Sequence, residues 1–482
     1  MEVRWFRQDK EAVLAELRRG VRPLMATTTA AGPLDELVAL HIELGVFEAL
    51  DQLPVQRQRA GIADELLLRT LATLPFLPES ALDPAARLLF QEPAILLRLG
   101  WAPAQIQAGD NLRHRHPEGR RAESLPCHPD TLRDAFRRIE ATAWLRVQEA
   151  GVSALYERRL VRGKVYAIDG TCLGNDYRLV CLVCVSAQRP VIVAWRLLQG
   201  TASEKGREAE VTRELVEQAL RLGGGDCIEL LLADALYADG PLIAWLAYEK
   251  GIDVLVPLPS DRLMVRDALG MAQRDLLTWT RHRYVHTVQG HKQARTIAVA
   301  SVGAMTSWDS FTAAARGYGV PDASLWVTLV REIEPEEKPL QDCWALVSTR
   351  RFANGYAAFQ AYRPRWHIEN DGYRELKEGF GLEQQRWGRD ASAAHCRTTL
   401  TLLAFNTAQI YRCRGGQRLA KLGIRRLRRQ AQAELGRSPV VLYMDDCYGV
   451  LSVEELLSVV GFPARQGLLP ALHIPNRPHG PT

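Results

Sequence analysis

The chain has 482 residues, a length typical of about two to four domains. Its composition, 47% hydrophobic and 24% charged residues, is that of an ordinary globular protein and excludes extensive disorder. The net charge of +5 permits a polyanionic partner, and the lack of any run of 18 apolar residues or N-terminal signal core predicts a cytoplasmic protein without a membrane partner.

The first 155 residues are predicted to be helical, because apolar residues recur at spacings of three and four. The pattern is clearest in "LDELVALHIELGVFEALDQL" and "GIADELLLRTLATL". A later run predicts one long amphipathic helix with Asp130 as its N-cap. The polar linker between them carries a basic group made up of Arg113, Arg115, Arg120 and Arg121.

The pattern changes near residue 164 to short apolar strands. "KVYAIDGT" predicts a strand ending at Asp169, and two further strands follow as a hairpin. A helix with a glycine stop at Gly223 then precedes a buried strand ending at Asp234, another helix and the strand "IDVLVPLP". This order predicts an α/β fold, a mixed sheet with helices on its faces.

Residues 259–341 interrupt this alternation and read as β-rich. "RYVHTVQGHKQARTIAVAS" alternates about a glycine-containing turn, as a hairpin does. Trp279, Trp308 and Trp326 fit a small insertion core, and the last two also fit stacking on an unpaired or flipped base. The main pattern resumes with the strand "CWALVSTRR".

The nine cysteines are an odd number without a regular framework, which predicts free thiols in a reducing compartment. One close pair, Cys181 and Cys184, lies in an apolar run. A zinc site would need a second pair at suitable spacing, so we expect both to be core residues of a strand.

The stretch "YRPRWHIENDGYRELK", residues 362–377, places Tyr362, Arg365 and Glu369 on one face of a helix. At about 100° per residue, offsets of four and seven return close to the starting direction. A solvated face with an ion pair between Arg365 and Glu369 fits the same spacing. Pro364 suits a first helical turn, so Tyr362 can also precede the helix.

Asp169 and Asp234 each end a predicted strand. If the strands are neighbours, the two carboxylates lie side by side, where ligand sites of open α/β sheets occur, although each aspartate could instead cap a turn. Two aspartates and Glu369 together would repel one another unless a cation neutralised them, and hard oxygen ligands select Mg²⁺ or Mn²⁺. Two such ions about 4 Å apart can clamp an in-line phosphoryl displacement.

The segments "AIDGT" at 167–171, "LLADALYAD" at 231–239 and "YRPRWHIENDGYRELK" resemble the DDE transposases of bacterial insertion sequences. More narrowly, they are similar to the branch with a Tyr-Arg-Glu-Lys motif and a β-rich insertion. The resemblance implies an RNase H-like core over 160–258 and 342–413, interrupted by the insertion at 259–341. It also implies cleavage of double-stranded DNA at transposon ends and strand transfer into target DNA by a homodimer.

Under this resemblance Asp169, Asp234 and Glu369 are catalytic ligands of two Mg²⁺ ions, which Mn²⁺ can replace. Tyr362, Arg365 and Lys377 would contact phosphates near the scissile bond. The family places its lysine seven residues after the glutamate, whereas Lys377 lies eight after Glu369, about 80° off on an uninterrupted helix. Unwinding near Gly372 would change that angle, and an insertion aromatic is expected to help at a DNA hairpin end.

Residues 412–429 hold eight Arg or Lys residues and no acidic residue. They are Arg412, Arg414, Arg418, Lys421, Arg425, Arg426, Arg428 and Arg429. This density suits phosphate contacts, although a solvated basic helix fits as well, and the last four residues are the candidates for DNA binding. We divide the rest into a helical region, 1–155, that could bind DNA ends, and a basic C-terminal segment and tail, 414–482.

Two alternatives to a transposase remain open at this stage. One is a metal-dependent nuclease on the same core that performs no strand transfer. The other is a domesticated DNA-binding protein that lacks catalysis. A gene lying between short terminal inverted repeats with flanking direct repeats would mark a mobile element.

Overall fold

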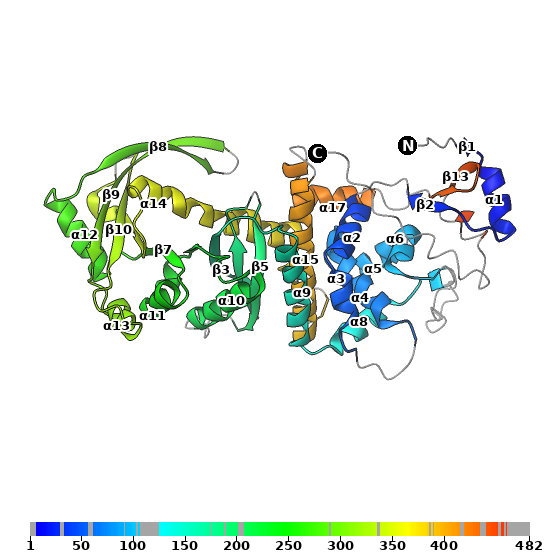
Figure 1. Cartoon of the computed structure of the whole chain (residues 1–482), viewed down its shortest axis with the longest axis horizontal. Helices are drawn as coiled ribbons and strands as arrows, with labels where there is room; N and C mark the ends of the chain where they lie inside the picture. The colour runs from blue at the N-terminus through cyan, green and yellow to red at the C-terminus, as the bar shows by residue number, and fades with distance from the viewer. Residues whose placement is uncertain are drawn as a thin grey trace, which may run out of the picture. The chain divides into compact units, whose positions relative to one another are not determined.

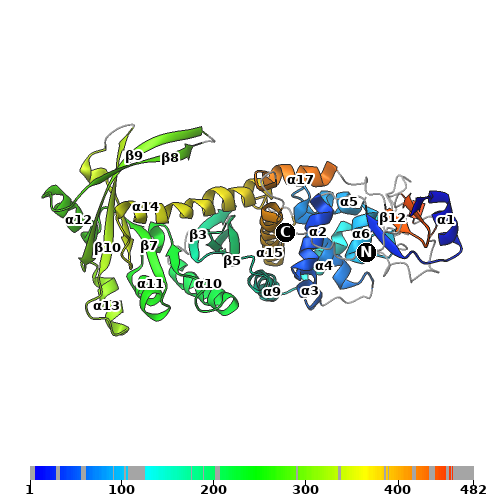
Figure 2. The ribbon, with the colours of Figure 1, turned by 45° about the horizontal axis from the view of Figure 1, so that its top comes forward.

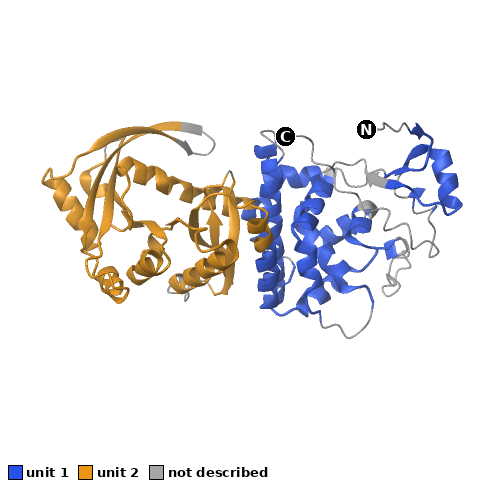
Figure 3. Cartoon of the chain, in the orientation of Figure 1, with its two compact units in different colours: residues 1–151, 376–482 blue, residues 152–375 orange. Residues whose placement is uncertain are grey.

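A computed structural model of the chain divides into two compact units, residues 1–151 with 376–482 and residues 152–375 (Figure 3). The structure describes residues 6–28, 33–55, 61–90, 92–102, 105–106, 125–174, 176–187, 189–200, 207–288, 291–334, 338–384, 387–388, 390–414, 419–433, 440–451, 455–456 and 459. The basic linker arginines Arg113, Arg115, Arg120 and Arg121 lie outside these residues, as does Arg418. Each unit is described by itself below.

The unit of residues 152–375 is built on one nine-stranded mixed sheet, as predicted (Figure 1). Its strand order is β5-β4-β3-β6-β7-β11-β10-β9-β8. The strands are β3 (Val165–Leu173), β4 (Tyr177–Cys184), β5 (Val191–Gln199), β6 (Leu230–Leu232), β7 (Asp253–Leu258), β8 (Thr280–Val288), β9 (His291–Met305), β10 (Leu325–Glu334) and β11 (Trp344–Ser348).

The order β5-β4-β3-β6-β7 combines an antiparallel meander with two parallel neighbours. Strand β3 pairs antiparallel with β4 and parallel with β6, and β6 pairs parallel with β7. All eight residues of β4 are buried, because the sheet is covered on both faces there. Cys181 and Cys184 are therefore core residues, as predicted, and none of the nine cysteines forms a disulfide.

The predicted insertion contributes three strands to this same sheet. Strand β10 pairs antiparallel with β11 on one side and with β9 on the other, and β8 pairs with β9. The predicted hairpin is therefore present, and its far end extends past β10 as a two-stranded ribbon (Figure 2). Two helices, α12 (Leu263–Gln273) and α13 (Asp309–Gly317), complete the segment.

Helices cover the sheet on both sides. Helices α10 (Glu208–Gly223) and α11 (Gly240–Ala244) lie on one side, and α14 (Gly355–Tyr362) lies on the other (Figures 1 and 2). Helix α11 continues as a π turn, η3 (Trp245–Glu249). Helix α10 includes Gly223, so the predicted stop is off by one residue: Gly224, with φ of 93°, ends the helix because glycine adopts this conformation without strain.

The other unit is mainly helical. Its helices are α1 (Lys10–Arg18), α2 (Pro33–Glu43), α3 (Val46–Asp51), α4 (Asp64–Thr73), α5 (Leu82–Phe90), α6 (Pro93–Leu99), α8 (Pro129–Arg137), α15 (Ala391–Arg414) and α17 (Ile424–Ala433), and α9 (Ala143–Glu157) runs into the sheet unit. The predicted long helix from Asp130 is wrong, because α8 and α9 are separate helices. The N-cap is His128, since Pro129 takes the first helical position.

The chain termini form a small sheet that the sequence did not predict. Strands β1 (Arg7–Gln8), β2 (Met25–Thr28), β12 (Val440–Tyr443) and β13 (Cys447–Leu451) pair in the order β1-β13-β12-β2. Val13 and Leu17 of α1 share a buried cluster with Leu442 and Leu451. The segment after residue 414 therefore includes a packed element that closes on the N-terminal strands. Within the described part of the chain, no helix combines the length and apolarity needed to span a bilayer.

Candidate active site

Asp169 and Asp234 lie at the same level of the sheet. The predicted strand end at Asp169 is wrong, because β3 continues past it to Leu173 and stays paired with β4. Strands β3 and β6 are parallel neighbours, and Ala167 pairs with Leu232. Asp169 and Asp234 each follow two residues later, so adjacent parallel strands bring both carboxylates to one edge. The condition set by the sequence analysis, that these two strands are neighbours, is met.

Asp169 is nearly enclosed, with 8% of its surface exposed. Its Oδ1 accepts a hydrogen bond from the backbone N–H of Gly170 at 2.7 Å. Burial, followed by the negative charge of Asp234, raises the pKa of Asp169 to about 7, although the Gly170 hydrogen bond and Arg365 oppose the shift. The negative charge of the ionised Asp169 side chain is therefore only partly balanced by the groups around it.

Asp234 caps the 3₁₀ turn η2 (Ala235–Tyr237). Its Oδ1 accepts from the N–H of Leu236 at 2.8 Å, so the capping interpretation of this residue is correct. The cap fixes the direction of the side chain at the end of β6. Capping and ligand binding are compatible, because the cap engages one of the two carboxylate oxygens.

The segment that carries Glu369 is not a continuous α-helix. Helix α14 is followed by the 3₁₀ turn η5 (Arg363–Arg365) and by two π turns, η6 (Ile368–Tyr373) and η7 (Glu375–Gly379). Rotation by 100° per residue does not hold across such turns, so the 80° offset, which assumed an uninterrupted helix, does not apply to Lys377. The departure from a regular α-helix that was considered near Gly372 is present as η6. Tyr362 ends α14, and Pro364 lies within the 3₁₀ turn instead of starting a helix.

Tyr362 and Arg365 nevertheless contact β3 and the residue that follows β6, and Arg365 also pairs with Glu369. The Tyr362 hydroxyl donates to the carbonyl oxygen of Ala233 at 3.1 Å, next to Asp234. The buried Arg365 guanidinium lies 5.6 Å from the Tyr362 ring centroid. Its Nη1 is 2.7 Å from Glu369 Oε1 and 3.6 Å from Asp169 Oδ2. The i,i+4 pair therefore exists, and Arg365 joins two of the predicted ligands.

Tyr373 is a site residue that the sequence reading missed. Its buried hydroxyl donates to the backbone carbonyl oxygen of Asp169, and its side chain also hydrogen-bonds to that of Cys181. The bond ties the π turn that carries Glu369 to strand β3. Only its position four residues after Glu369 could have suggested that role, and many core tyrosines share such a spacing.

Replacing Tyr373 by Phe should therefore loosen the link between Glu369 and Asp169. We expect a loss of about 0.5–1.5 kcal/mol in the free energy of unfolding, the usual contribution of one hydrogen bond. Urea titration of the wild type and variant measures this loss. Tyr356→Phe is a control from the same unit, since the Tyr356 hydroxyl accepts from Gln360 at 2.5 Å within α14 and makes no bond to the site. Equal stability of the wild type and Tyr373→Phe would show that the bond contributes nothing.

The carboxylate oxygens suit a hard divalent cation, and the charge around Asp169 points the same way. Among the described residues, no three His, Cys, Asp or Glu side chains are already grouped closely enough to hold a metal ion. Arg365 instead supplies the positive charge that faces Asp169 and Glu369. The donor chemistry thus fits Mg²⁺, with Arg365 as the present counter-charge.

The remaining motif residues have local partners. Lys377 belongs to the helical unit, where its Nζ lies 2.6 Å from Glu383 Oε1. His367 pairs with Asp371 at 2.5 Å. In the insertion, the guanidinium of Arg351 lies 5.3 Å from the ring centroid of Trp326.

The arginines of the basic segment differ from one another. Arg412 and Arg428 are buried, and Arg414 pairs with Glu43 at 2.9 Å. Arg425, Arg426 and Arg429 are exposed, as is Lys421. The segment is therefore neither a uniformly solvated helix nor a uniform basic face.

Comparison with known families supplies an independent result. Residues 183–407 match the family model described as a transposase DDE domain, a region that includes Asp234 and Glu369. The comparison with curated proteins gave no match. The match implies transposase activity and an enzyme that binds DNA, and DDE transposases generally use divalent metals such as Mg²⁺. The mixed sheet is consistent with an RNase H-like DDE domain. The fold and the family match together support a DDE transposase.

Proposed function

We propose that the protein is a cut-and-paste transposase of the Tyr-Arg-Glu-Lys branch that cleaves transposon ends and joins them to target DNA. The observation that supports the proposal is that Asp169 and Asp234 lie on adjacent strands, while Arg365 pairs with both Asp169 and Glu369. This arrangement lies within the unit that contains most of the matched DDE region.

The three carboxylates would hold two Mg²⁺ ions, which Mn²⁺ can replace. When bound, the ions activate a water or a 3′-hydroxyl and stabilise the leaving oxygen. Tyr362 and Tyr373 would hold the backbone beside the two aspartates through their bonds to Ala233 and Asp169. Arg365, once its carboxylate partners bind cations, is placed to hold a phosphate oxygen with its planar guanidinium.

DNA and a second copy of the chain are the proposed partners. Two transposon ends must be cut and joined in one event, which favours a homodimer that holds both ends. Within each chain we propose 160–258 with 342–413 as the catalytic core, 259–341 as its insertion and 1–155 as an end-binding region. The basic segment from 414 onward would add non-specific DNA contacts, and the protein would act in the bacterial cytoplasm at the nucleoid.

Incubation with a duplex that carries the candidate terminal repeat, target plasmid and Mg²⁺ tests this proposal. A transposase should generate 3′-hydroxyl ends at the repeat boundary and covalently joined products. Cutting without joining would favour a metal-dependent nuclease on the same core. Binding without cutting in either Mg²⁺ or Mn²⁺ would favour a domesticated DNA-binding protein.

A further inference from the structure

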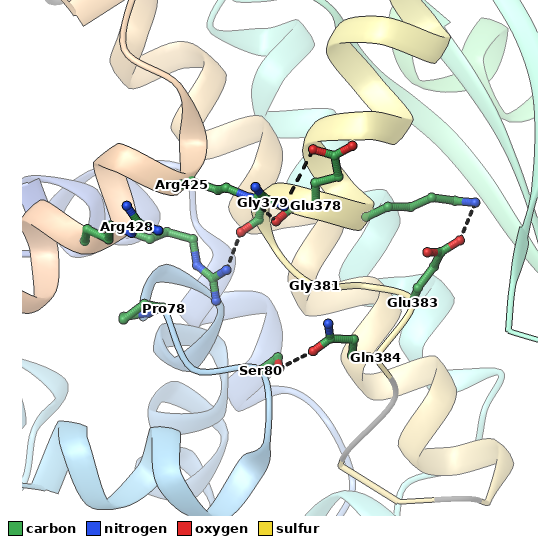
Figure 4. Close-up of a pocket in the computed structure, with 11 residues that line it drawn as sticks. Pro78, Ser80, Glu378, Gly379, Gly381, Glu383, Gln384, Arg425 and Arg428 are labelled. Atoms are coloured by element: carbon green, nitrogen blue, oxygen red, sulfur yellow. Dashed lines mark hydrogen bonds and ion pairs between the residues drawn. The ribbon is translucent and has the colours of Figure 1, made fainter.

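A cavity of about 380 Å³ lies in the helical unit, between α17 and the turn that follows η7 (Figure 4). Its charged lining residues are Lys377, Glu378, Glu383, Arg425, Arg428 and Arg429. The other lining residues are neutral, so four cations face two carboxylates. The cavity therefore carries an excess of positive charge.

Two of the four cations that line the cavity form ion pairs with its carboxylates, and two do not. Lys377 pairs with Glu383 at 2.6 Å, and Arg425 lies 3.6 Å from Glu378 while its Nε donates to the Glu378 carbonyl oxygen at 2.9 Å. Within the described residues, neither Arg428 nor Arg429 forms an ion pair with a carboxylate. The excess positive charge thus resides on these two side chains.

Arg428 is an unusual arginine, since it is only 5% exposed. Its guanidinium donates to the carbonyl oxygens of Gly379 and Glu79, which are neutral groups (Figure 4). Among the described residues its Nε has no hydrogen-bond partner. Burial, with the nearby Arg397 guanidinium, lowers the pKa of Arg428 to about 10, although the charge of Glu79 opposes the shift. Burying a cation that forms no direct ion pair is costly, and an anion in the cavity would offset that cost.

We propose that this cavity binds a backbone phosphate of DNA. The proposal rests on the proposed function and names a contact that the catalytic carboxylates do not provide. Arg425 and Arg429 are exposed at the cavity, so a long polyanion can reach it. Arginine forks hold phosphate oxygens in a bidentate manner, while the buried Arg428 adds a fixed positive charge behind them. Such a contact positions the duplex without reading its sequence.

The chain offers a matched control for this proposal. Arg426 is an exposed arginine on the same turn of α17, but it does not line the cavity. The variants Arg429→Gln and Arg426→Gln therefore remove the same charge from the same helix and differ only in access to the cavity. Because both side chains are exposed, neither change should disturb folding, and thermal melting verifies this for each protein.

Binding of a fluorescent duplex of unrelated sequence is measured against salt in EDTA, where no cleavage occurs. We expect Arg429→Gln to flatten the slope of log K against log salt by about 1, the loss of one phosphate contact. Arg426→Gln removes an exposed charge of the same basic segment but no cavity contact, so it should flatten the slope clearly less than Arg429→Gln does. Equal slopes for the two variants would overturn the proposal, because the cavity would then have no special role.

A second arm separates DNA from a free anion. Titration of inorganic phosphate at constant ionic strength should displace the duplex from the wild type and have a weaker effect on Arg429→Gln. Calorimetric binding of inorganic phosphate that Arg429→Gln abolishes, together with unchanged duplex binding, would assign the cavity to a small anion and overturn the DNA contact. Neither arm depends on cleavage, so failure here is distinct from failure of the transposase proposal, which the metal-dependent reaction tests.

Discussion

Replacing Asp234 by Asn is expected to reduce Mg²⁺-dependent DNA cleavage by at least about 10³-fold. The metal clamp contributes several kcal/mol of transition-state stabilisation, and each 1.36 kcal/mol corresponds to a factor of ten. Asparagine caps a turn as well as aspartate does, so the fold at η2 should be kept. Single alanine changes at Asp169 and Glu369 should have comparable effects. Affinity for DNA, measured in EDTA, should stay near the wild-type value, because few phosphate contacts are lost.

Asp239→Asn is the matched control for this change. Asp239 also caps a helix, through Oδ1 and the N–H of Leu242 at 2.7 Å, but it lies outside the three converging carboxylates. Cleavage by this variant should remain close to that of the wild type. Substantial Mg²⁺-dependent cutting by Asp234→Asn would show that Asp234 is not a metal ligand and serves only as a cap.

The second large effect concerns stability and pH in the absence of metal. The pKa of Asp169 in the folded protein is about 7, above its ordinary value of 3.8. The folded state therefore binds more protons than the unfolded state between these values, and stability falls as the pH rises. Above pH 7 this contribution of Asp169 to the free energy of unfolding is fully lost, and the total loss is about 4 kcal/mol.

Asp169→Asn carries no charge at any pH and should escape this loss. In EDTA we expect its advantage in unfolding free energy over the wild type to grow by about 2–3 kcal/mol between pH 5 and pH 8. Urea unfolding at both pH values measures the difference, and added Mg²⁺ should reduce it by stabilising the wild type. A difference that is independent of pH would show that Asp169 is not held in an unfavourable charged state.

The sequence predicted which two strands carry the aspartates because local signals mark them, although β3 continues past Asp169 to Leu173. "KVYAIDGT" and "CIELLLADALYAD" are short apolar runs that end at a carboxylate, and in the structure β3 and β6 lie side by side. Helical spacing likewise placed Arg365 beside Glu369, where the ion pair forms. These features depend on period and turn chemistry, which a few neighbouring residues determine.

Features that depend on distant residues escaped prediction. The π turns after Ile368 and the bond from Tyr373 to the Asp169 carbonyl arise from packing against β3, which no local pattern encodes. The pairing of β1 with β13 joins segments more than 400 residues apart. Arg426 and Arg428 are similar in sequence context, yet only Arg428 is buried against the carbonyls of Gly379 and Glu79.

Replacement of the bridging 3′-oxygen at the scissile phosphate by sulfur tests the central claim most directly. If the three carboxylates hold ions that contact the leaving oxygen, cleavage of the sulfur-containing strand should be lost in Mg²⁺, which avoids sulfur ligands. It should be restored in Mn²⁺, which is softer and accepts them. If the ratio of the two cleavage rates, oxygen-containing over sulfur-containing strand, is the same in Mg²⁺ and Mn²⁺, no metal ion contacts the leaving group. That result would contradict the role assigned to Asp169, Asp234 and Glu369.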